Sequence, residues 1–369
     1  MEARPVSLAV ALRSVLMLLA CAAWSSVVLG RPLTIANFGG ANGQAQAVAF
    51  QKPFVTQHDA AVSAVEYSGD LAPIRAMVQA GKIDWDIAEV ESADLIAGCE
   101  TGLFERIDRA QLAHSSMMLP GAVHECGVGA FVWSTVMAYD AGRMKEPPRS
   151  WADFWDVAKY PGKRGMRKGA RYNMEFALMA DGVRRADVYA TLATEQGVER
   201  ALRKLEALRP HIVWWESGAQ PPKMIASGEV LMSSAFNGRI AAANRDGAGN
   251  LQIAWPDAIY ELDYWVILKG SPRRALAQRY INFVTSGEAQ LAFSREIPYG
   301  PTNFNAIMKY DIGRPIQPGA VRQALIDLSM ADSDLPSAPG NMRRSLPFNA
   351  AFWIQHGPAI EKRLAALFR

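Results

Sequence analysis

The sequence lacks the motifs that mark common enzyme classes. It contains no HExxH, no GxSxG and no GxxxxGK[ST], and its five histidines, at 58, 114, 124, 211 and 356, lack the spacing of metal ligands. Asp263 with Glu175 or Glu91 could be imagined as the acid/base pair of a hydrolase. Nothing else in the sequence links these acids. A secreted hydrolase is therefore the disfavoured alternative, and we expect no catalytic residues.

Long apolar runs and a strong net charge are also absent. Beyond the N-terminal segment no stretch has 18 consecutive apolar residues, so the sequence predicts no membrane-spanning helix. The formal net charge is only +3 and is spread along the chain. The most basic stretch, 159–171, lacks the stacking aromatics of a nucleic-acid groove. Nucleic acid is therefore not a predicted partner.

The first 30 residues have the pattern of a secretory signal peptide. Arg4 and Arg13 are followed by the apolar run 14–23, which contains no acid, and residues 28–30 form a small-residue cleavage site before Arg31. The pattern predicts export, most simply to a bacterial periplasm, with cleavage after Gly30.

Cysteine is scarce, with three residues in the chain. Cys21 lies in a segment that resembles a lipobox, but the following residues stay apolar, so lipid anchoring remains the alternative. Cleavage after Gly30 would leave Cys99 and Cys126, and two isolated cysteines in an exported protein favour a disulfide. Two buried free thiols are the other possibility. We expect no metal site and no cofactor.

From residue 33 the chain alternates strand-like and helix-like segments, which is typical of α/β domains with mostly parallel sheets. Ser92 or Asp94 is expected to cap the helix that follows the third strand. Helices are predicted at 44–57, 71–80, 195–208, 273–285 and near the C-terminus. Strands are predicted at 33–38, 62–67, 86–90, 130–139, 212–215, 230–234, 251–255 and 264–268.

A glycine-rich loop follows the first predicted strand, at Asn37-Phe38-Gly39-Gly40. Glycines let a backbone approach a ligand closely, and a helix that begins there could offer N–H groups to an anion. The GxGxxG spacing of dinucleotide-binding loops is not met. A plain tight turn is an equal alternative.

Three segments between residues 233 and 303 each place an aromatic ring or a carboxylate at the end of a predicted element: 233–239, 262–265 and 298–303. Such groups suit the capture of an ammonium ion. Asp263 is the strongest candidate, because an acid with apolar neighbours is costly to bury without a partner. Trp215, beside Glu216-Ser217-Gly218, is a further aromatic candidate.

The mature chain resembles the spermidine/putrescine-binding proteins of bacterial ABC importers. The resemblance rests on a series of motifs in one order: 150–155, 161–163, 226–230, 234–239, 262–265 and 298–303. It implies a two-lobed periplasmic-binding-protein (Venus-flytrap) fold, in which each lobe is a mostly parallel sheet flanked by helices. Lobe one would comprise 31–135 with 262–309, and lobe two 136–261 with 310–369. Such a protein, expected to be a monomer, would deliver a small-molecule amine to a membrane permease.

The resemblance also implies individual roles. Phe236 stands where relatives carry a ligand-stacking Trp, Asp263 where they carry the carboxylate that faces the amine, and Tyr299 where they carry an aromatic wall. The first-strand loop has Phe38 followed by two glycines, and Glu91 falls where relatives have Ser. These departures favour a smaller amine or amino acid over a long polyamine. The predicted ligand is a small cationic or zwitterionic amine of the polyamine, putrescine or γ-aminobutyrate type.

The complete predicted ligand set is Phe38, Gly39, Gly40, Glu91, Glu175, Trp215, Phe236, Asp263 and Tyr299. A binder of an anion or a metal through the Gly39-Gly40 loop is the alternative within binding proteins. An iron binder of this fold would be expected to show adjacent tyrosines, which this sequence lacks.

Overall fold

The computed structural model describes residues 31–312 and 333–368, without the side chains of residues 310–312. The predicted signal peptide, Cys21 and part of the predicted second lobe lie outside the described residues. Contacts divide the chain into Met1–Pro32 and Leu33–Arg369, and the sheet, the core and the site described below all belong to the second unit. Within the described ranges, no helix has the length and apolar character needed to cross a membrane.

The described residues form one nine-stranded sheet, in the order β2-β1-β3-β8-β4-β7-β5-β6 with β9 paired to β8. Pairing is parallel at both ends of the sheet, as predicted. In the centre, β8 pairs antiparallel with β3 and with β4, and β4 pairs antiparallel with β7. The sheet is therefore mixed. Its strands are β1 (Leu33–Asn37), β2 (Val62–Glu66), β3 (Ile87–Glu91), β4 (Gly127–Asp140), β5 (Arg164–Arg167), β6 (Ile212–Trp215), β7 (Met232–Phe236), β8 (Leu251–Ile267) and β9 (Leu346–Pro347).

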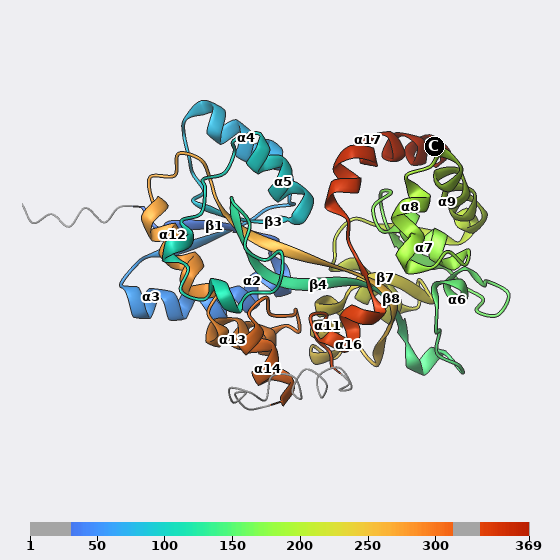
Figure 1. Cartoon of the computed structure of the whole chain (residues 1–369). Helices are drawn as coiled ribbons and strands as arrows, with labels where there is room; N and C mark the ends of the chain where they lie inside the picture. Colours follow the sequence, from blue (N-terminus) through green and yellow to red (C-terminus); the bar gives the residue numbers. More distant parts are fainter. Residues whose placement is uncertain (1–30, 313–332, 369) are drawn as a thin grey trace, which may run out of the picture. The chain divides into compact units, whose positions relative to one another are not determined.

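Strand β8 corrects one prediction. The strands expected at 251–255 and 264–268 are parts of a single strand, Leu251–Ile267. Pro256 lies between the two expected strands, and proline cannot donate to a strand ladder. The structure accommodates it in a bulge, where the pairing with β4 shifts between Thr135 and Met137 and Asp257 has a φ of 60°. Two long paired strands, β4 and β8, thus join the elements around β1–β3 to those around β5–β7 (Figure 1).

Helices flank the sheet (Figure 1). The predicted helix at 44–57 is divided into two α-helical segments by a π-helical turn, Ala47–Gln51. The helix predicted at 195–208 is found with those bounds and buries Val198, Ala201, Leu202 and Leu205 on one face. The α-helices are α2 (Gly40–Gln46), α3 (Lys52–His58), α4 (Leu71–Ala80), α5 (Ser92–Glu100), α6 (Trp151–Trp155), α7 (Asn173–Ala180), α8 (Val188–Leu192), α9 (Glu195–Leu208), α10 (Gln220–Ser227), α11 (Asn237–Arg245), α12 (Arg274–Val284), α13 (Gly287–Glu296), α14 (Phe304–Ile312), α16 (Pro339–Arg344) and α17 (Ala350–Leu367).

The start of α5 differs from prediction. Neither Ser92 nor Asp94 caps it; the N-cap position is Glu91, which makes no side-chain capping bond. The Ser92 hydroxyl instead donates to Glu261 Oε1 at 2.5 Å, and the Ser92 N–H donates to the same oxygen at 3.0 Å. Ser92 therefore satisfies a buried acid of β8 rather than its own helix.

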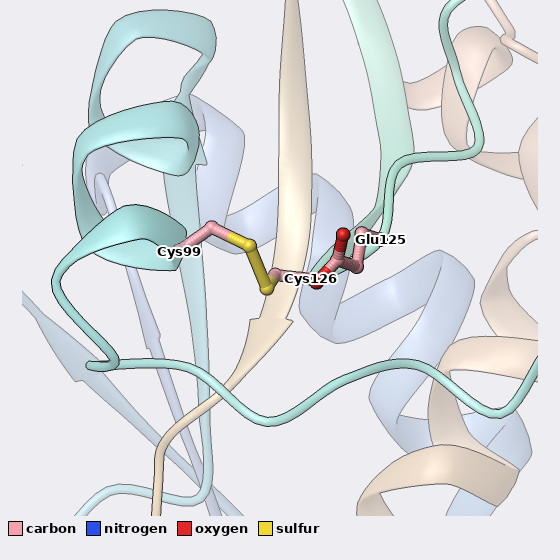
Figure 2. A group of neighbouring side chains, drawn as sticks. All are labelled: Cys99, Glu125 and Cys126. Carbon is pink, nitrogen blue, oxygen red and sulfur yellow. A yellow bond between two sulfur atoms is a disulfide. The ribbon is translucent and has the colours of Figure 1, made fainter.

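Cys99, near the end of α5, and Cys126, just before β4, form the predicted disulfide (Figure 2). Glu125 lies beside it, and the three side chains are close enough to share a metal ion. A cysteine binds metal as a thiolate. Because both sulfur atoms are bonded to each other, we assign this group a structural role.

Candidate ligand-binding site

A cavity of about 420 Å³ lies against the central strands, within the usual size range of ligand pockets. It combines carboxylates, arginines and aromatic rings from both ends of the sheet. The lining residues are Phe38, Asn42, Glu66, Tyr67, Ser68, Glu89, Glu91, Phe131, Trp133, Arg167, Glu216, Ser217, Gly218, Phe236, Arg239, Asp263 and Tyr299.

The face of the sheet beside this pocket carries an unusual set of acids. Glu89 and Glu91 alternate along β3, and Glu261 and Asp263 alternate along the neighbouring strand β8. The antiparallel register pairs Glu91 with Asp263, so all four side chains leave the same face of the sheet. Glu89 is 0% exposed and Asp263 is 3% exposed.

Amide and indole groups hold these acids in place. Asp263 Oδ1 accepts a 2.7 Å hydrogen bond from the indole Nε1 of Trp133. Glu89 accepts from Asn42 Nδ2 at 2.8 Å and from Gln46 Nε2 at 2.6 Å. Asn37 in turn donates to Gln46 Oε1 at 2.9 Å. Asp263 and Glu89 are therefore held by neutral donors rather than by cations.

This environment changes how the acids titrate. Burial, with the charges of Glu89 and Glu91 added, raises the pKa of Asp263 well above its usual value. Burial also raises the pKa of Glu89, although its hydrogen bonds from Gln46, Asp263 and Asn42 oppose this. For Glu261, burial and the charge of Glu91 raise the pKa to about 8.

Two arginines also line the pocket. The guanidinium of Arg167 lies 5.6 Å from the ring centres of both Tyr172 and Phe236, and its Nη1 is 3.7 Å from Glu91 Oε1. Arg239, in the first turn of α11, donates from Nη2 to the carbonyl of Gly39 at 3.2 Å. Among the described residues, the buried Arg239 Nε and Arg167 Nη1 have no hydrogen-bond partner. Both arginines line the pocket, where their positive charge can face a ligand carboxylate.

Aromatic side chains form the walls. Phe236 stands edge-on to Trp133 and to Trp215, with ring centres 5.0 Å and 5.4 Å apart. Tyr299 stacks on Phe131 at 4.9 Å. Elsewhere on the lining, Phe38 stacks on Tyr67 at 5.4 Å. Such rings can pack against a ligand's methylene groups or attract its ammonium ion.

The Gly39-Gly40 loop makes room for side chains. Both glycines have positive φ, 57° and 54°. A Cβ on Gly39 would lie 2.0 Å from the Glu66 carboxyl, and one on Gly40 would lie 2.5 Å from Arg239 Nη1. The carboxylate of Glu66 beside the loop would repel an anion, so the structure does not favour the anion alternative.

Comparison with known proteins identifies the family. Residues 46–310 match the family of bacterial extracellular solute-binding proteins. The chain belongs to this family. The γ-aminobutyric acid-binding protein of Pseudomonas aeruginosa is 46% identical over 334 residues, which cover 90% of each chain. The solute-binding protein described here is thus a binding protein and not an enzyme, and its family places it outside the cytoplasm.

Solved structures agree with this assignment. An ABC transporter substrate-binding protein from Bradyrhizobium japonicum is 31% identical, with a TM-score of 0.79 over 92% of this chain and 100% of that one. The Atu4243 GABA receptor is 28% identical, with a TM-score of 0.76 over 92% of this chain and 98% of that one. The fold is the two-lobed fold of the periplasmic binding proteins.

The structure brings together five of the nine predicted ligand residues of this solute-binding protein. Phe38, Glu91, Phe236, Asp263 and Tyr299 line the pocket. The remaining four do not line it. Gly39 and Gly40 lie next to the side chains of Glu66 and Arg239. Trp215 is in contact with Phe236, and Glu175 is buried in α7.

Sequence reasoning missed Glu89, Trp133, Arg167 and Arg239. Glu89 lies between Ala88 and Val90, the same pattern of an acid among apolar residues that singled out Asp263. That signal could have found it. Trp133 lies in a strand that is buried except at its last residue, Asp140. No sequence feature distinguishes it from a core residue.

Glu175 forms a separate polar site in the core. Its Oε1 accepts from Trp353 Nε1 at 2.6 Å and from the Tyr189 hydroxyl at 3.2 Å. Burial raises its pKa to about 7, although these bonds favour the charged form. All eight residues of α7 are buried. Glu175, which was predicted as a ligand residue, therefore lies in the core.

We expect Glu175→Gln to stabilise the protein at pH 8 and to change little at pH 4. The pKa of Glu175 is about 7 in the folded protein, above its value in the unfolded chain. Its ionisation therefore lowers stability as the pH rises above the unfolded pKa, and the full loss is reached above the folded pKa. A shift of this size corresponds to at most about 3 kcal/mol. Urea unfolding of both proteins at the two pH values measures the difference. An equal effect at pH 4 and pH 8 would contradict the assignment.

Proposed function

We propose that this protein captures γ-aminobutyrate or a closely similar ω-amino acid and delivers it to the permease of an ABC importer. The observation that carries the proposal is the charge arrangement of the pocket, which holds buried acids on β3 and β8 and two arginines. A zwitterion with separated charges satisfies both. Two relatives are named for γ-aminobutyrate, which supports this ligand class.

Each ligand group has a named counterpart. The ammonium group would lie against Asp263 and Glu89, and the carboxylate against Arg239 or Arg167, while Phe236 covers the methylene chain. Putrescine and spermidine have no carboxylate, so they would leave two cations facing a cationic ligand. The polyamine alternative is thereby disfavoured.

The interaction energies are sufficient for a transport protein. A hydrogen bond to a charged group contributes about 1.5–3 kcal/mol, and a cation over an aromatic ring about 0.5–2 kcal/mol. Two or three such contacts at each end of the ligand, less the cost of ordering it, can reach roughly −8 kcal/mol, the free energy of a micromolar complex.

The proposed transport cycle involves two lobes, 31–135 with 262–309 and 136–261 with 310–369, that close on the ligand. Arg239 and Gly39, which are hydrogen-bonded, come from different lobes in this division. The proposal includes cleavage of the leader after Gly30, which would release a monomer into the periplasm, with lipid anchoring at Cys21 as the alternative.

A thermal-shift panel tests the function. The purified mature protein is heated with γ-aminobutyrate, putrescine, spermidine, an α-amino acid and acetate. A ligand that binds the folded state raises the melting temperature by an amount set by its concentration over Kd. We expect the largest rise with γ-aminobutyrate, which should be recovered unchanged. A rise with polyamines alone, or with acetate alone, would contradict the proposal.

Arg239→Met should reverse the preference between zwitterion and diamine. Loss of hydrogen bonds to the ligand carboxylate is expected to weaken γ-aminobutyrate binding by about 1.5–3 kcal/mol, whereas putrescine binding should be unchanged or improved. Calorimetric titration with each ligand measures the ratio. Arg245→Met is the matched control, because Arg245 ends the same helix and donates to the carbonyl of Glu296 outside the pocket. Equal losses for both ligands would argue against a carboxylate contact.

A further inference from the structure

We propose that ligand capture is a proton exchange: the empty pocket holds one proton between Asp263 and Glu89, and the incoming ammonium group displaces it to solvent. The inference rests on the proposed function and extends it, because it states how the same site keeps its charge constant on binding.

The sheet register places several buried carboxyls next to one another, and the proposed exchange avoids ionising two of them together. Glu91 is paired directly with Asp263, and Glu89 and Glu261 are each two residues away on the same face. Two neighbouring buried carboxyls cannot both ionise at ordinary cost, because like charges and desolvation act in the same direction. One of them holds a proton, and the other accepts its hydrogen bond.

The pair meant here is Asp263 and Glu89. None of its described neighbours neutralises a second negative charge on it. Arg239, from α11, acts on Glu89 but donates to Gly39. Arg167 and Arg171 are within 3.7 Å and 3.4 Å of Glu91 rather than of the pair. Trp133, from β4, supplies Asp263 with a neutral donor.

The remaining ionisable groups near the pair are acids or neutral phenols. Glu261 accepts from Ser92 and Tyr172. Burial raises the pKa of Tyr67, after β2, of Tyr264 in β8, of Tyr280 in α12 and of Tyr299, after α13, so these phenols stay neutral at pH 7. Glu66 lines the same cavity. None of these groups can neutralise a second charge on the pair, whereas a ligand ammonium can.

The exchange balances atoms and charge. In the empty site the Asp263 carboxyl O–H donates to the Glu89 carboxylate. When the ligand enters as an ammonium ion, its N–H groups donate to both acids, and the Asp263 proton passes to the buffer. No covalent bond in the ligand changes. One positive charge enters as one leaves, so the pocket never holds two uncompensated buried carboxylates.

Calorimetric titration of the wild-type protein with γ-aminobutyrate tests the exchange. Titrations at pH 7 in phosphate and in Tris, which differ in ionisation enthalpy, give the number of protons released per ligand from the difference in observed heat. We expect release close to one proton. Affinity should also rise with pH, by up to about tenfold per unit, while the pair in the empty site remains protonated.

Two variants and a control locate the source of the proton. Asp263→Asn and Glu89→Gln should each bind more weakly and release almost no proton, because each variant keeps only one of the two carboxyls proposed to share the proton. Glu175→Gln removes a buried acid of raised pKa that lies outside the pocket, so it should release as much as wild type. Circular dichroism confirms that each variant is folded.

The possible outcomes separate the two proposals. Binding of γ-aminobutyrate by wild type with equal heats in both buffers would overturn the proton exchange and leave the function standing. Undiminished release by both pocket variants would also overturn it, since the proton would come from elsewhere. Failure of wild type to bind γ-aminobutyrate would overturn the proposed function together with the inference that rests on it.

Discussion

Replacing Asp263 by asparagine is expected to weaken γ-aminobutyrate binding by about 2–4 kcal/mol, the usual cost of removing one partner from a desolvated charge pair. Asparagine keeps the shape of the side chain, and its amide oxygen can still accept from Trp133. What is lost is a carboxylate that is only 3% exposed, where an ion pair is stronger than in bulk water. The effect should therefore appear in affinity and not in folding.

The folded state of this variant should be as stable as wild type or more stable. Burial and the nearby acids make Asp263 a cost to the empty protein, as the raised pKa shows. Asp257→Asn is a matched control, because Asp257 lies on the same strand, β8, outside the pocket, and pairs with Arg185 at 2.9 Å. Calorimetric titration of both variants measures the loss. An affinity for Asp263→Asn within about twofold of wild type would mean that Asp263 does not face the amine.

Removing the disulfide should destabilise the protein by about 3–4 kcal/mol on the chain-entropy estimate. The bridge joins cysteines 27 residues apart and restrains the unfolded chain between α5 and β4. Neither cysteine lines the ligand pocket. Stability should therefore fall while ligand affinity is retained.

Urea unfolding of the Cys99→Ser, Cys126→Ser double variant against wild type measures this difference. Wild type unfolded with dithiothreitol is the second comparison, since it breaks the bridge without changing the sequence. Thiol counting on denatured, unreduced mature protein, which lacks Cys21, should find no free thiol. Two free thiols would show that the bridge is absent, and an unchanged unfolding midpoint would show that it contributes nothing to stability.

Much of the local structure could be predicted because its causes are local. The amphipathic repeat of residues 195–208 predicted α9 correctly, since a period near 3.6 residues places its apolar side chains on one face. The strand at 212–215 was likewise predicted with its observed bounds. The continuity of β8 was not predicted, because the bulge that accommodates Pro256 depends on long-range pairing with β4.

The site was predicted less completely, because most of its contacts join distant residues. Arg239 and Gly39 are 200 residues apart in sequence and are hydrogen-bonded in the structure. Trp133 and Asp263 are 130 residues apart. The register between β3 and β8 depends on the packing of both strands, so the sequence offers no local pattern from which to infer that Glu89 and Asp263 meet.

By itself, the sequence determined the α/β class, most of the strands and helices and the two cysteines available for pairing, and it singled out Asp263 as a candidate ligand residue. These follow from periodicity, counting and the cost of burying an acid. Only the tertiary structure decided that β8 is continuous, that Glu175 belongs to the core and that four acids share one face beside two arginines. Such features depend on strand register and on which faces pack together, and these are set by contacts between segments far apart in the chain.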